Sequence, residues 1–481
     1  MRKIRLYWFF LSAIFFSCED EAGRPPNFVV IVVDDLGWAD VKSNFSESFY
    51  DTPNVDALAA RGIRFTQAYS ANPVCSPTRA ALITGMHPNR VNITDWLPGQ
   101  DPRDKKLLGP QDGDALSLDE ITMAELLGEA GYRSAFVGKW HLGEEEEFWP
   151  TGQGFDLNIG GWGAGAPRRV KGVSNGYYSP YGIPSLKDGP EGEYLTDRLT
   201  DESLRFLQEN KDSPFLLYLS YYTVHTPIQA AEKHIEKYRG KRQALDLGEI
   251  PHKKEGEGWT KLVQEDADYA SMVAAMDENV GRVMDELDKL GLRENTWVIF
   301  TSDNGGLSTL FQKNAPTANG PLRAGKGWCY EGGIRVPFIV AGPGIGQPGQ
   351  VREELVVSMD VFQTVISLAG VEQPKNDGEN LAPILTGEGK LERDVLFWHF
   401  PHYHGSAWTP GSAIRQGDWK LVVFYEDDRA ELYNLGTDPS ETRDLAAGQP
   451  EKTAELRRLL EQKLEETNAR YPMANPGYEG R

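Results

Sequence analysis

The feature that most restricts the fold is a continuous apolar run near the start of the chain, Phe-Val-Val-Ile-Val-Val at residues 28–33. It is rich in β-branched residues, as expected for a strand buried on both faces of a largely parallel sheet. Residues 215–221 and 296–301 are also apolar runs, and residues 134–138 form a shorter one. The sequence therefore predicts an α/β protein with a large mixed, mostly parallel central sheet flanked by helices. Those helices are expected at residues 52–61, 118–130, 269–290 and 359–369.

Polar residues follow each of the four predicted strands, in chain order Asp34-Asp35, Lys139 with His141, His225, and Asp303-Asn304. Open α/β sheets bind ligands outside the carboxyl ends of their strands. These groups are therefore expected to converge on one crevice.

Two adjacent carboxylates, Asp34 and Asp35, repel one another unless a cation lies beside them. A hard divalent metal with oxygen ligands is the natural interpretation, and Asp303 and Asn304 offer further oxygens. Each motif taken alone has a simpler explanation. The aspartates could form an Asx turn, the Lys-x-His pair a solvated edge, and residues 302–306 a tight turn. A single histidine such as His225 could be an ordinary surface or core residue.

The segment 73–85 reads Pro-Val-Cys-Ser-Pro-Thr-Arg-Ala-Ala-Leu-Ile-Thr-Gly. Pro77 suits a first helical turn and Gly85 suits a helix end, so Cys75 is expected at the start of a short apolar helix. Free backbone N–H groups and the helix dipole favour an anion there, which predicts an acidified, reactive thiol. The alternative is a buried, inert cysteine.

Two motifs carry a resemblance to a known family. Cys-Ser-Pro-Thr-Arg at 75–79, followed by Ala-Ala-Leu-Ile-Thr-Gly, resembles the first signature of the type I, formylglycine-dependent sulfatases of the alkaline phosphatase superfamily. Residues 131–141, Gly-Tyr-Arg-Ser-Ala-Phe-Val-Gly-Lys-Trp-His, resemble the second. Thr78 stands where serine or alanine is commoner, and the Cys-x-Pro-x-Arg frame is intact. The resemblance extends from about Asn27 to the low 440s.

The resemblance implies hydrolysis of a sulfate ester on a carbohydrate. A maturation enzyme would oxidise Cys75 to formylglycine, whose hydrated form attacks sulfur and later expels sulfate. A calcium ion would be held by residue 75 and by four strand-end residues: Asp34, Asp35, Asp303 and Asn304. Arg79 and His141 would orient the nucleophile, Lys139 and Lys326 would hold the sulfate, and His225 would protonate the leaving sugar oxygen, with Lys326 as the competing acid.

The resemblance also implies a catalytic domain over residues 25–390 and a smaller C-terminal α+β subdomain over residues 391–481. Four short alternating segments at 395–400, 412–415, 419–424 and 430–434 predict antiparallel strands, and residues 451–467 predict a terminal helix.

The substrate pocket is expected to involve two irregular stretches. One is the Gly- and Pro-rich insertion at 152–190, and the other is the aromatic and His-rich run at 398–404, which could equally be a hydrophobic strand edge. The candidate substrate-binding residues are Trp162, Arg168, His402 and His404. Residues 229–260 are charged and without pattern, and are expected to be an exposed loop.

The charge of the chain restricts its partners. Lys and Arg total 50 and Asp and Glu total 71, which gives a formal net charge of −21. Nucleic acid is therefore excluded as a partner, and the interior of a long polyanion is disfavoured. The charge predicts an exo-acting enzyme. The aromatic residues of the expected pocket suit galactose-type rings, and the resemblance is to polysaccharide-degrading bacterial sulfatases, which implies a 4- or 6-sulfated galactose or N-acetylgalactosamine. Solubility is the simpler explanation of the charge itself.

The N-terminus has the pattern of an export signal. Basic residues 2–5 precede an apolar run at 6–16, which is too short for a membrane span. The following Phe-Phe-Ser-Cys resembles a bacterial lipobox, with Cys18 as the lipidated residue and residues 1–18 as signal peptide. Plain secretory cleavage is the alternative. Export to the periplasm or cell envelope is expected, with membrane contact only through the lipid.

Two other functions remain open at this point. The same crevice suits a phosphate-monoester or phosphonate hydrolase, although one calcium with two lysines favours the monoanionic sulfate. A lipid-anchored glycan-binding protein without activity is the second alternative, against which every expected catalytic position is occupied.

Overall fold

The computed structural model describes residues 24–100 and 102–479. Its centre is an eight-stranded mixed sheet in which β12, β1, β9, β5 and β6 run parallel. β14 is antiparallel to both β12 and β2. The strands in spatial order are β15 (Gln350–Arg352), β2 (Ile63–Phe65), β14 (Phe338–Ala341), β12 (Thr296–Ser302), β1 (Asn27–Val33), β9 (Phe215–Tyr221), β5 (Arg133–Gly138) and β6 (Leu157–Ile159).

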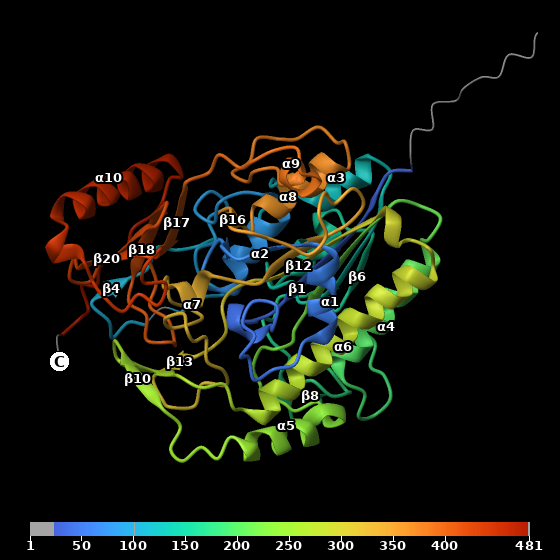
Figure 1. Ribbon diagram of the computed structural model, residues 1–481, viewed down its shortest axis with the longest axis horizontal. Helices are drawn as coiled ribbons and strands as arrows, with labels where there is room; N and C mark the ends of the chain where they lie inside the picture. The colour runs from blue at the N-terminus through green and yellow to red at the C-terminus, as the bar shows by residue number, and fades with distance from the viewer. Residues whose placement is uncertain (1–23, 101, 480–481) are drawn as a thin grey trace, which may run out of the picture.

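Helices cover both faces of this sheet (Figure 1). Because strand side chains alternate, Val29, Ile31 and Val33 of β1 pack on one side with α1 (Pro53–Arg61), α4 (Leu195–Glu209) and α6 (Ala267–Lys289). Phe28, Val30 and Val32 pack on the other side with α2 (Cys75–Thr84), α3 (Met123–Glu129), α8 (Asp360–Leu368) and α9 (Ala382–Thr386). Both faces of the apolar strands are thus covered by helices, as the sequence predicts.

A second sheet forms the C-terminal part of the molecule (Figure 1). It is antiparallel, in the order β17 (Val395–Phe400), β18 (Gly411–Gln416), β19 (Trp419–Phe424) and β20 (Ala430–Asn434). Helix α10 (Pro450–Glu466) packs on one face through Leu456, Leu460 and Leu464, which share a helix face. The opposite face carries Trp398 and Val422, which pack against Tyr69 and Trp328. The expected fold class is confirmed.

The two parts are also joined by buried charges. Lys420 of β19 lies 2.9 Å from Glu331 of α7 (Glu331–Ile334) and 2.8 Å from Glu441. Glu441 also accepts the backbone N–H of Glu331 at 2.7 Å. All three side chains are fully buried.

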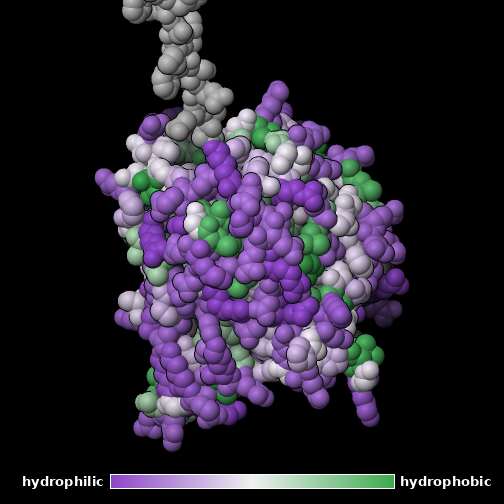
Figure 2. Space-filling model, turned by 90° about the vertical axis from the view of Figure 1, so that its right-hand side faces the viewer, coloured by the Kyte–Doolittle hydropathy of each residue, from purple (hydrophilic) through white to green (hydrophobic). Residues whose placement is uncertain are grey.

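Smaller elements complete the described chain: α5 (Glu232–Ala244), the strands β3 (Ala68–Tyr69), β4 (Leu107–Leu108), β7 (Arg169–Val170), β8 (Ser174–Asn175), β10 (His252–Glu255), β11 (Gly258–Lys261), β13 (Thr309–Leu310), β16 (Val356–Val357) and β21 (Met473–Ala474), and the 3₁₀ turns Trp38–Asp40, Glu146–Phe148, Pro150–Gln153, Arg293–Asn295 and Ala446–Gly448. Within the described residues, no helix combines the length and the apolar character that a membrane crossing requires. Figure 2 shows one face of the molecule, largely hydrophilic with small scattered apolar areas.

Two local expectations are wrong. Residues 229–260 are not a loop, because they contain α5 and the hairpin of β10 and β11. α5 buries only Ile235 and Tyr238, which leaves too narrow an apolar stripe to show in the sequence. The helix expected at 118–130 begins only at Met123, because Thr122 and Glu125 form a reciprocal capping box there.

Candidate active site

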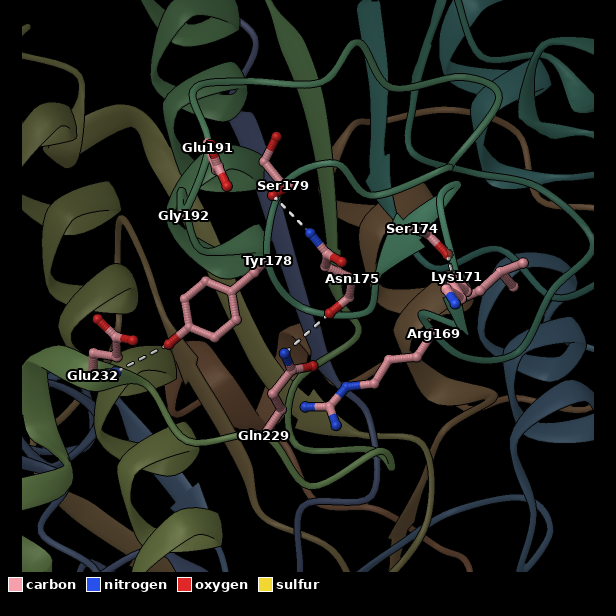
Figure 3. Close-up of a pocket in the computed structure, with 11 residues that line it drawn as sticks. Arg169, Lys171, Ser174, Asn175, Tyr178, Ser179, Glu191, Gly192, Gln229 and Glu232 are labelled. Atoms are coloured by element: carbon pink, nitrogen blue, oxygen red, sulfur yellow. Dashed lines mark hydrogen bonds between the residues drawn. The ribbon is translucent and has the colours of Figure 1, made fainter.

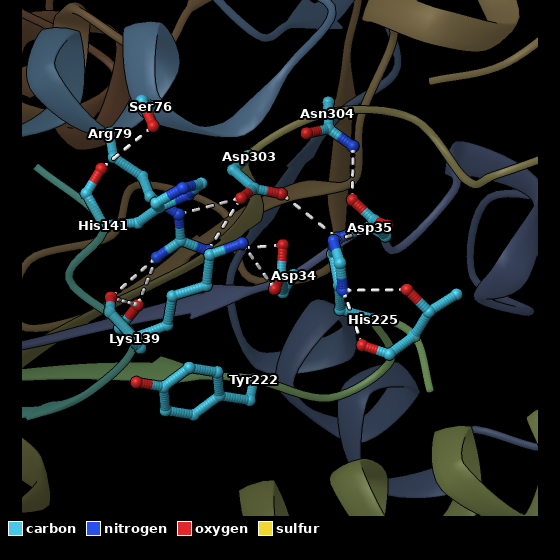
Figure 4. A network of polar contacts seen from close by, with 12 residues as sticks. Asp34, Asp35, Ser76, Arg79, Lys139, His141, Tyr222, His225, Asp303 and Asn304 are labelled. Carbon is cyan, nitrogen blue, oxygen red and sulfur yellow. Dashed lines mark hydrogen bonds and ion pairs between the residues drawn. The ribbon is translucent and has the colours of Figure 1, made fainter. Parts of the chain in front are cut away.

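The carboxyl ends of β1, β5, β9 and β12 bring the predicted polar residues together (Figure 4). The backbone fixes this meeting point, since Asp34 donates its N–H to Thr223 O at 3.0 Å and Lys139 donates its N–H to Ser220 O at 2.7 Å. Gly138, at φ 107°, leaves β5 so close to Ser220 that an added Cβ would lie 1.8 Å from its carbonyl oxygen. Only glycine fits there.

Each carboxylate of the site has a cation beside it. Lys139 Nζ lies 2.8 Å from Asp34 Oδ2, and Lys326 Nζ lies 2.6 Å from Asp35 Oδ1. Arg79 donates from Nε and Nη2 to Asp303 Oδ2 at 2.9 and 2.7 Å. The guanidinium is also held by Lys139 O and Ser220 Oγ, at 2.8 and 2.6 Å. The site is therefore a buried cluster of charges, in which a carboxylate contacts each of the three cations.

Helix α2 places Cys75 beside this cluster of charges. Val74 precedes it in extended conformation, and Gly85, at φ 70°, ends the helix by donating its N–H to Ala81 O. Ser76 Oγ donates to His141 O at 2.9 Å and accepts the N–H of Leu97 at 3.0 Å. The start of α2 is thereby tied to the strand end of β5 and to the loop after residue 96.

The thiol itself is not acidified, which corrects the expectation drawn from its place at a helix start. Cys75 is 2% exposed, and burial raises the pKa of its thiol, although Lys139 and Lys326 act in the opposite direction. An unmodified Cys75 is therefore a protonated thiol at neutral pH.

The residues fit a hard cation. Oxygens of Asp34 and Asp303 and the Cys75 sulfur lie within 4.8 Å of one another, as do ligand atoms of Asp34, Asp35 and His225. In the described part of the chain, Asp34 Oδ1 and Asn304 Oδ1 are buried and accept no hydrogen bond. Buried oxygens without a partner are costly unless a cation satisfies them. The donor set of carboxylate and amide oxygens suits calcium.

The carboxylates differ in how their charge is stabilised. Burial raises the pKa of Asp34 well above its usual range, and Lys139 only partly compensates. For Asp303, burial is outweighed by Arg79, Lys139 and Lys326, and its pKa lies below its ordinary value. The pKa of Asp35 is also lowered, because the adjacent Lys326 acts against burial and favours the ionised carboxylate. An additional cation beside Asp34 would remove the remaining imbalance.

The three histidines of the site are neutral. Burial, reinforced by Lys139, holds the pKa of His141 well below its usual range, and burial with Lys326 lowers that of His225 to about 3. Burial with Lys326 likewise lowers the pKa of His404 to about 3. His141 Nε2 lies 2.7 Å from Leu97 O, and a neutral ring in that contact has its proton on Nε2. His225 Nδ1 lies 2.8 Å from Thr226 O, which directs Nε2 toward Asp35 at 3.7 Å.

A cavity of about 320 Å³ opens over Cys75. Its walls include the predicted residues His141, Arg168, His225, Lys326 and His404. The other lining residues were not predicted from the sequence, although the aromatic Trp96 in Trp-Leu-Pro at 96–98 was an available signal. These residues are Trp96, Leu97, Pro98, Gln100 and Glu144, with residues 163–166. Gly165 allows a close approach, since an added Cβ would lie 2.4 Å from His141 Cε1.

Trp162 and His402 do not line this cavity. The ring of Trp162 packs against the main core, while its carbonyl accepts the N–H of His141 at 3.1 Å. His402 is 5% exposed, and its Nε2 lies 2.8 Å from Thr94 Oγ1. Both lie in irregular segments, where spacing along the sequence does not indicate which way a side chain points.

A larger cavity of about 490 Å³ is lined by residues of the 169–175 hairpin (Figure 3). Arg168 lines the first cavity and Arg169 the second, as expected for neighbours at the start of a strand. The larger cavity has no lining residue in common with the cavity over Cys75.

Comparison with known proteins agrees with this geometry. Residues 26–371 match the family model described as sulfatase. The chain belongs to the sulfatase family. It is accordingly a sulfuric ester hydrolase. Residues 324–470 of this sulfatase also match a model described as N-sulphoglucosamine sulphohydrolase, C-terminal, which begins well before residue 391, where the sequence predicts a subdomain boundary.

Similar proteins include carbohydrate sulfatases. A sulfatase of Formosa agariphila is 32% identical, with 96% of this chain and 92% of that protein covered. The N-acetylgalactosamine-6-sulfatase of Mus musculus is 32% identical, with 87% of this chain and 75% of that protein covered. The crystal structure of Ps i-CgsB in complex with k-i-k-neocarrahexaose superposes with a TM-score of 0.73 at 29% identity, covering 92% of this chain and 93% of that one.

Proposed function

We propose that this sulfatase removes sulfate from carbohydrate esters and uses a formylglycine at position 75 together with one calcium ion. The observation that carries this proposal is the buried cluster of charges around Cys75. Three cation–carboxylate pairs surround the residue, and two buried oxygens, Asp34 Oδ1 and Asn304 Oδ1, are left without a hydrogen bond.

Asp34, Asp35, Asp303 and Asn304 would hold calcium, which supplies positive charge that favours ionised oxygen at the reacting centre. Formylglycine supplies the nucleophilic oxygen of its hydrated aldehyde, and the Cys75 sulfur marks where that oxygen would stand. Lys139 and Lys326 place two further positive charges beside residue 75, where they can neutralise sulfuryl oxygens.

His141 is positioned to handle the proton of that nucleophile. Its Nε2–H is directed to Leu97 O, so its Nδ1 keeps a lone pair, and this nitrogen is buried without a partner in the described residues. A neutral imidazole in this state can accept a proton from a hydroxyl group at residue 75.

Protonation of the leaving oxygen is assigned to His225, with Lys326 as the competing residue. His225 is neutral in the resting site, and a bound sulfate monoanion would raise the pKa of its imidazole. His225→Gln and Lys326→Gln should be compared on a sugar sulfate and on a nitrophenyl sulfate. The variant that lacks the acid should lose far more rate on the sugar, because nitrophenolate leaves without a proton.

The proposed substrate is a 4- or 6-sulfated galactose or N-acetylgalactosamine at a chain end or in a short oligosaccharide. The net charge of −21 disfavours the interior of a polyanion. The similarity to an N-acetylgalactosamine-6-sulfatase and to a carrageenan-oligosaccharide complex supports this class of sugar. Sulfate release should be faster from enzymatic oligosaccharides than from intact polymer at matched sulfate concentration. Faster release from polymer would contradict the exo assignment.

One panel separates this proposal from its alternatives. Sulfate, phosphate and phosphonate monoesters of the same phenol should be compared before and after EDTA treatment and with calcium added back. We expect the sulfate ester to be preferred and turnover to depend on calcium. Preference for phosphate or phosphonate would favour the other hydrolases of the superfamily, and release from none of them would favour a glycan-binding protein.

We also propose export to the cell envelope, with maturation of Cys75 by a formylglycine-generating enzyme and a lipid anchor at Cys18. Cys18 lies outside the described residues, so the support is the lipobox-like sequence alone. Cys18→Ala should move the protein from the membrane fraction to the released fraction. Equal fractionation of variant and parent would contradict the anchor.

A further inference from the structure

A third cavity, of about 170 Å³, adjoins the cavity over Cys75. Gln100, His404 and Gly405 line both, so the two spaces share a wall. The larger cavity lined by the 169–175 hairpin has no such shared wall. A ligand whose reacting sugar lies over Cys75 can therefore continue into this third cavity.

We propose that this adjoining cavity is a binding subsite for the sugar residue next to the sulfated one. The inference rests on the proposed function and adds to it that the substrate is an oligosaccharide rather than a free monosaccharide sulfate. It assigns Phe311 as the residue that recognises the second sugar.

Phe311 has the exposure that such a role requires. Phe311 is 46% exposed, whereas Tyr403 and Trp408, which line the same cavity, are only 7% and 1% exposed. An exposed aromatic ring lining a cavity offers an apolar face to the C–H side of a pyranose ring. Isolated exposed phenylalanines are common on protein surfaces, but this one lies beside the reaction cavity.

Polar groups that can bind sugar hydroxyls line the same cavity as the ring. Gln100 and Thr409 offer an amide and a hydroxyl group. Lys105 and Glu257, whose Nζ and Oε2 lie 3.6 Å apart, offer a donor and an acceptor. An apolar face with a few polar groups is the usual composition of a small-molecule site.

The position of Phe311 is fixed by the small sheet of β10, β11 and β13. Thr309, two residues before Phe311, pairs with Thr260, and their hydroxyl oxygens lie 2.8 Å apart. After Phe311, Ala315 O accepts from Lys261 Nζ at 3.0 Å. At Gly258 an added Cβ would lie 2.9 Å from Ala407 Cβ, so this sheet packs against the 404–409 loop. The ring is therefore carried by an anchored segment rather than a free loop.

The test compares wild type, Phe311→Ala and Phe311→Trp on sulfated carrageenan and chondroitin oligosaccharides and on the matching monosaccharide sulfates. Phe311→Ala should raise KM for oligosaccharides about tenfold, change kcat less than about twofold and leave the monosaccharides unaffected, and Phe311→Trp should retain the oligosaccharide KM. Ile121→Ala is the matched control, since Ile121 is 47% exposed and lines none of the cavities described above.

Equal losses on both substrate classes, or unchanged oligosaccharide KM in Phe311→Ala, would overturn the subsite. Calorimetric binding of the desulfated oligosaccharides separates this proposal from the proposed function, because it needs no turnover. Weaker binding by Phe311→Ala supports the subsite even if no sulfate ester is hydrolysed, and equal binding by wild type and variant overturns it.

Discussion

Asp303 contacts both Arg79 and Asp35, one of the other proposed calcium ligands. One of its oxygens accepts both N–H groups of the Arg79 fork, and the other accepts the N–H of Asp35 at 3.1 Å. Asp303→Asn keeps the shape but removes the charge that holds Arg79. We expect kcat/KM to fall by about 100-fold or more and the calcium-induced rise in Tm to shrink.

Asp277→Asn is the control for this change, because Asp277 is also buried but binds backbone N–H groups of Asn54 and Val55, away from the site. It should alter stability and leave the calcium response intact. Asp303→Asn with undiminished turnover and an unchanged calcium response would remove Asp303 from the ligand set.

The sequence located these residues because they follow buried strands, and strand ends meet at one sheet edge. Asp34, Lys139, His225 and Asp303 were found by that rule. The strand-end rule fails where no regular element fixes the direction of a side chain. His402 is an example, since its ring contacts Thr94 instead of the cavity over Cys75. It also misses desolvation, which raises the pKa of Cys75 despite its place at a helix start.

Lys420 of β19 is a buried cation that lies between Glu331 of α7 and Glu441, and it thereby joins β19 to α7. Lys420→Met leaves Glu331 and Glu441 buried without their shared partner. Removing one member of a buried ion pair typically costs about 3–5 kcal/mol. We expect a clearly lower Tm, measured by differential scanning fluorimetry.

The double variant Lys420→Met with Glu441→Gln should recover part of this loss, since it removes the charge of Glu441, whereas Glu331 keeps Arg335 at 3.5 Å. A single variant as stable as wild type would show that the cluster does not join the two parts of the molecule.

The elements that could be predicted are those with a strong pattern. β1, β9 and the C-terminal strands agree with the sequence within a residue or two, because burial on one or both faces dictates their composition. α5 could not be predicted, since only Ile235 and Tyr238 are buried on an otherwise charged helix. The small sheet that carries Phe311 could not be predicted either, because its strands are short and largely polar.

For the whole molecule, buried carboxyl groups contribute to the pH dependence of stability. Burial raises the pKa of Asp40 and Glu441 to about 7 and of Asp277 to about 6. Their values in an unfolded chain are about 4. The stability from these groups is therefore complete below about pH 4 and is lost as pH rises through 6 to 7.

Glu331 acts in the opposite direction. Burial alone would raise the pKa of Glu331, but Lys420 and Arg335 outweigh it and lower the value to about 2. Its contribution is present above about pH 4.5 and is lost as pH falls toward 2.

The buried histidines act in the opposite direction to Glu441, since burial lowers the pKa of His225 and His404 to about 3 and their contribution to stability is lost as pH falls below about 6.5. The test therefore compares two chains: with calcium in excess, the Tm of Glu441→Gln relative to wild type should rise from pH 5 to pH 8, because only wild type ionises a buried Glu441 over that range. A difference in Tm that does not change with pH would refute this assignment.

Catalysis is proposed to depend on a modified residue at position 75, because the buried thiol supplies no hydrated aldehyde. The most direct measurement is the mass of the peptide that carries residue 75, taken alongside sulfate release, in preparations matured to different extents. We predict an aldehyde at position 75 in every active preparation, kcat proportional to the aldehyde fraction, and almost no turnover in Cys75→Ser produced in a host that matures only cysteine. Full turnover by protein whose Cys75 is entirely an unmodified thiol would contradict the account.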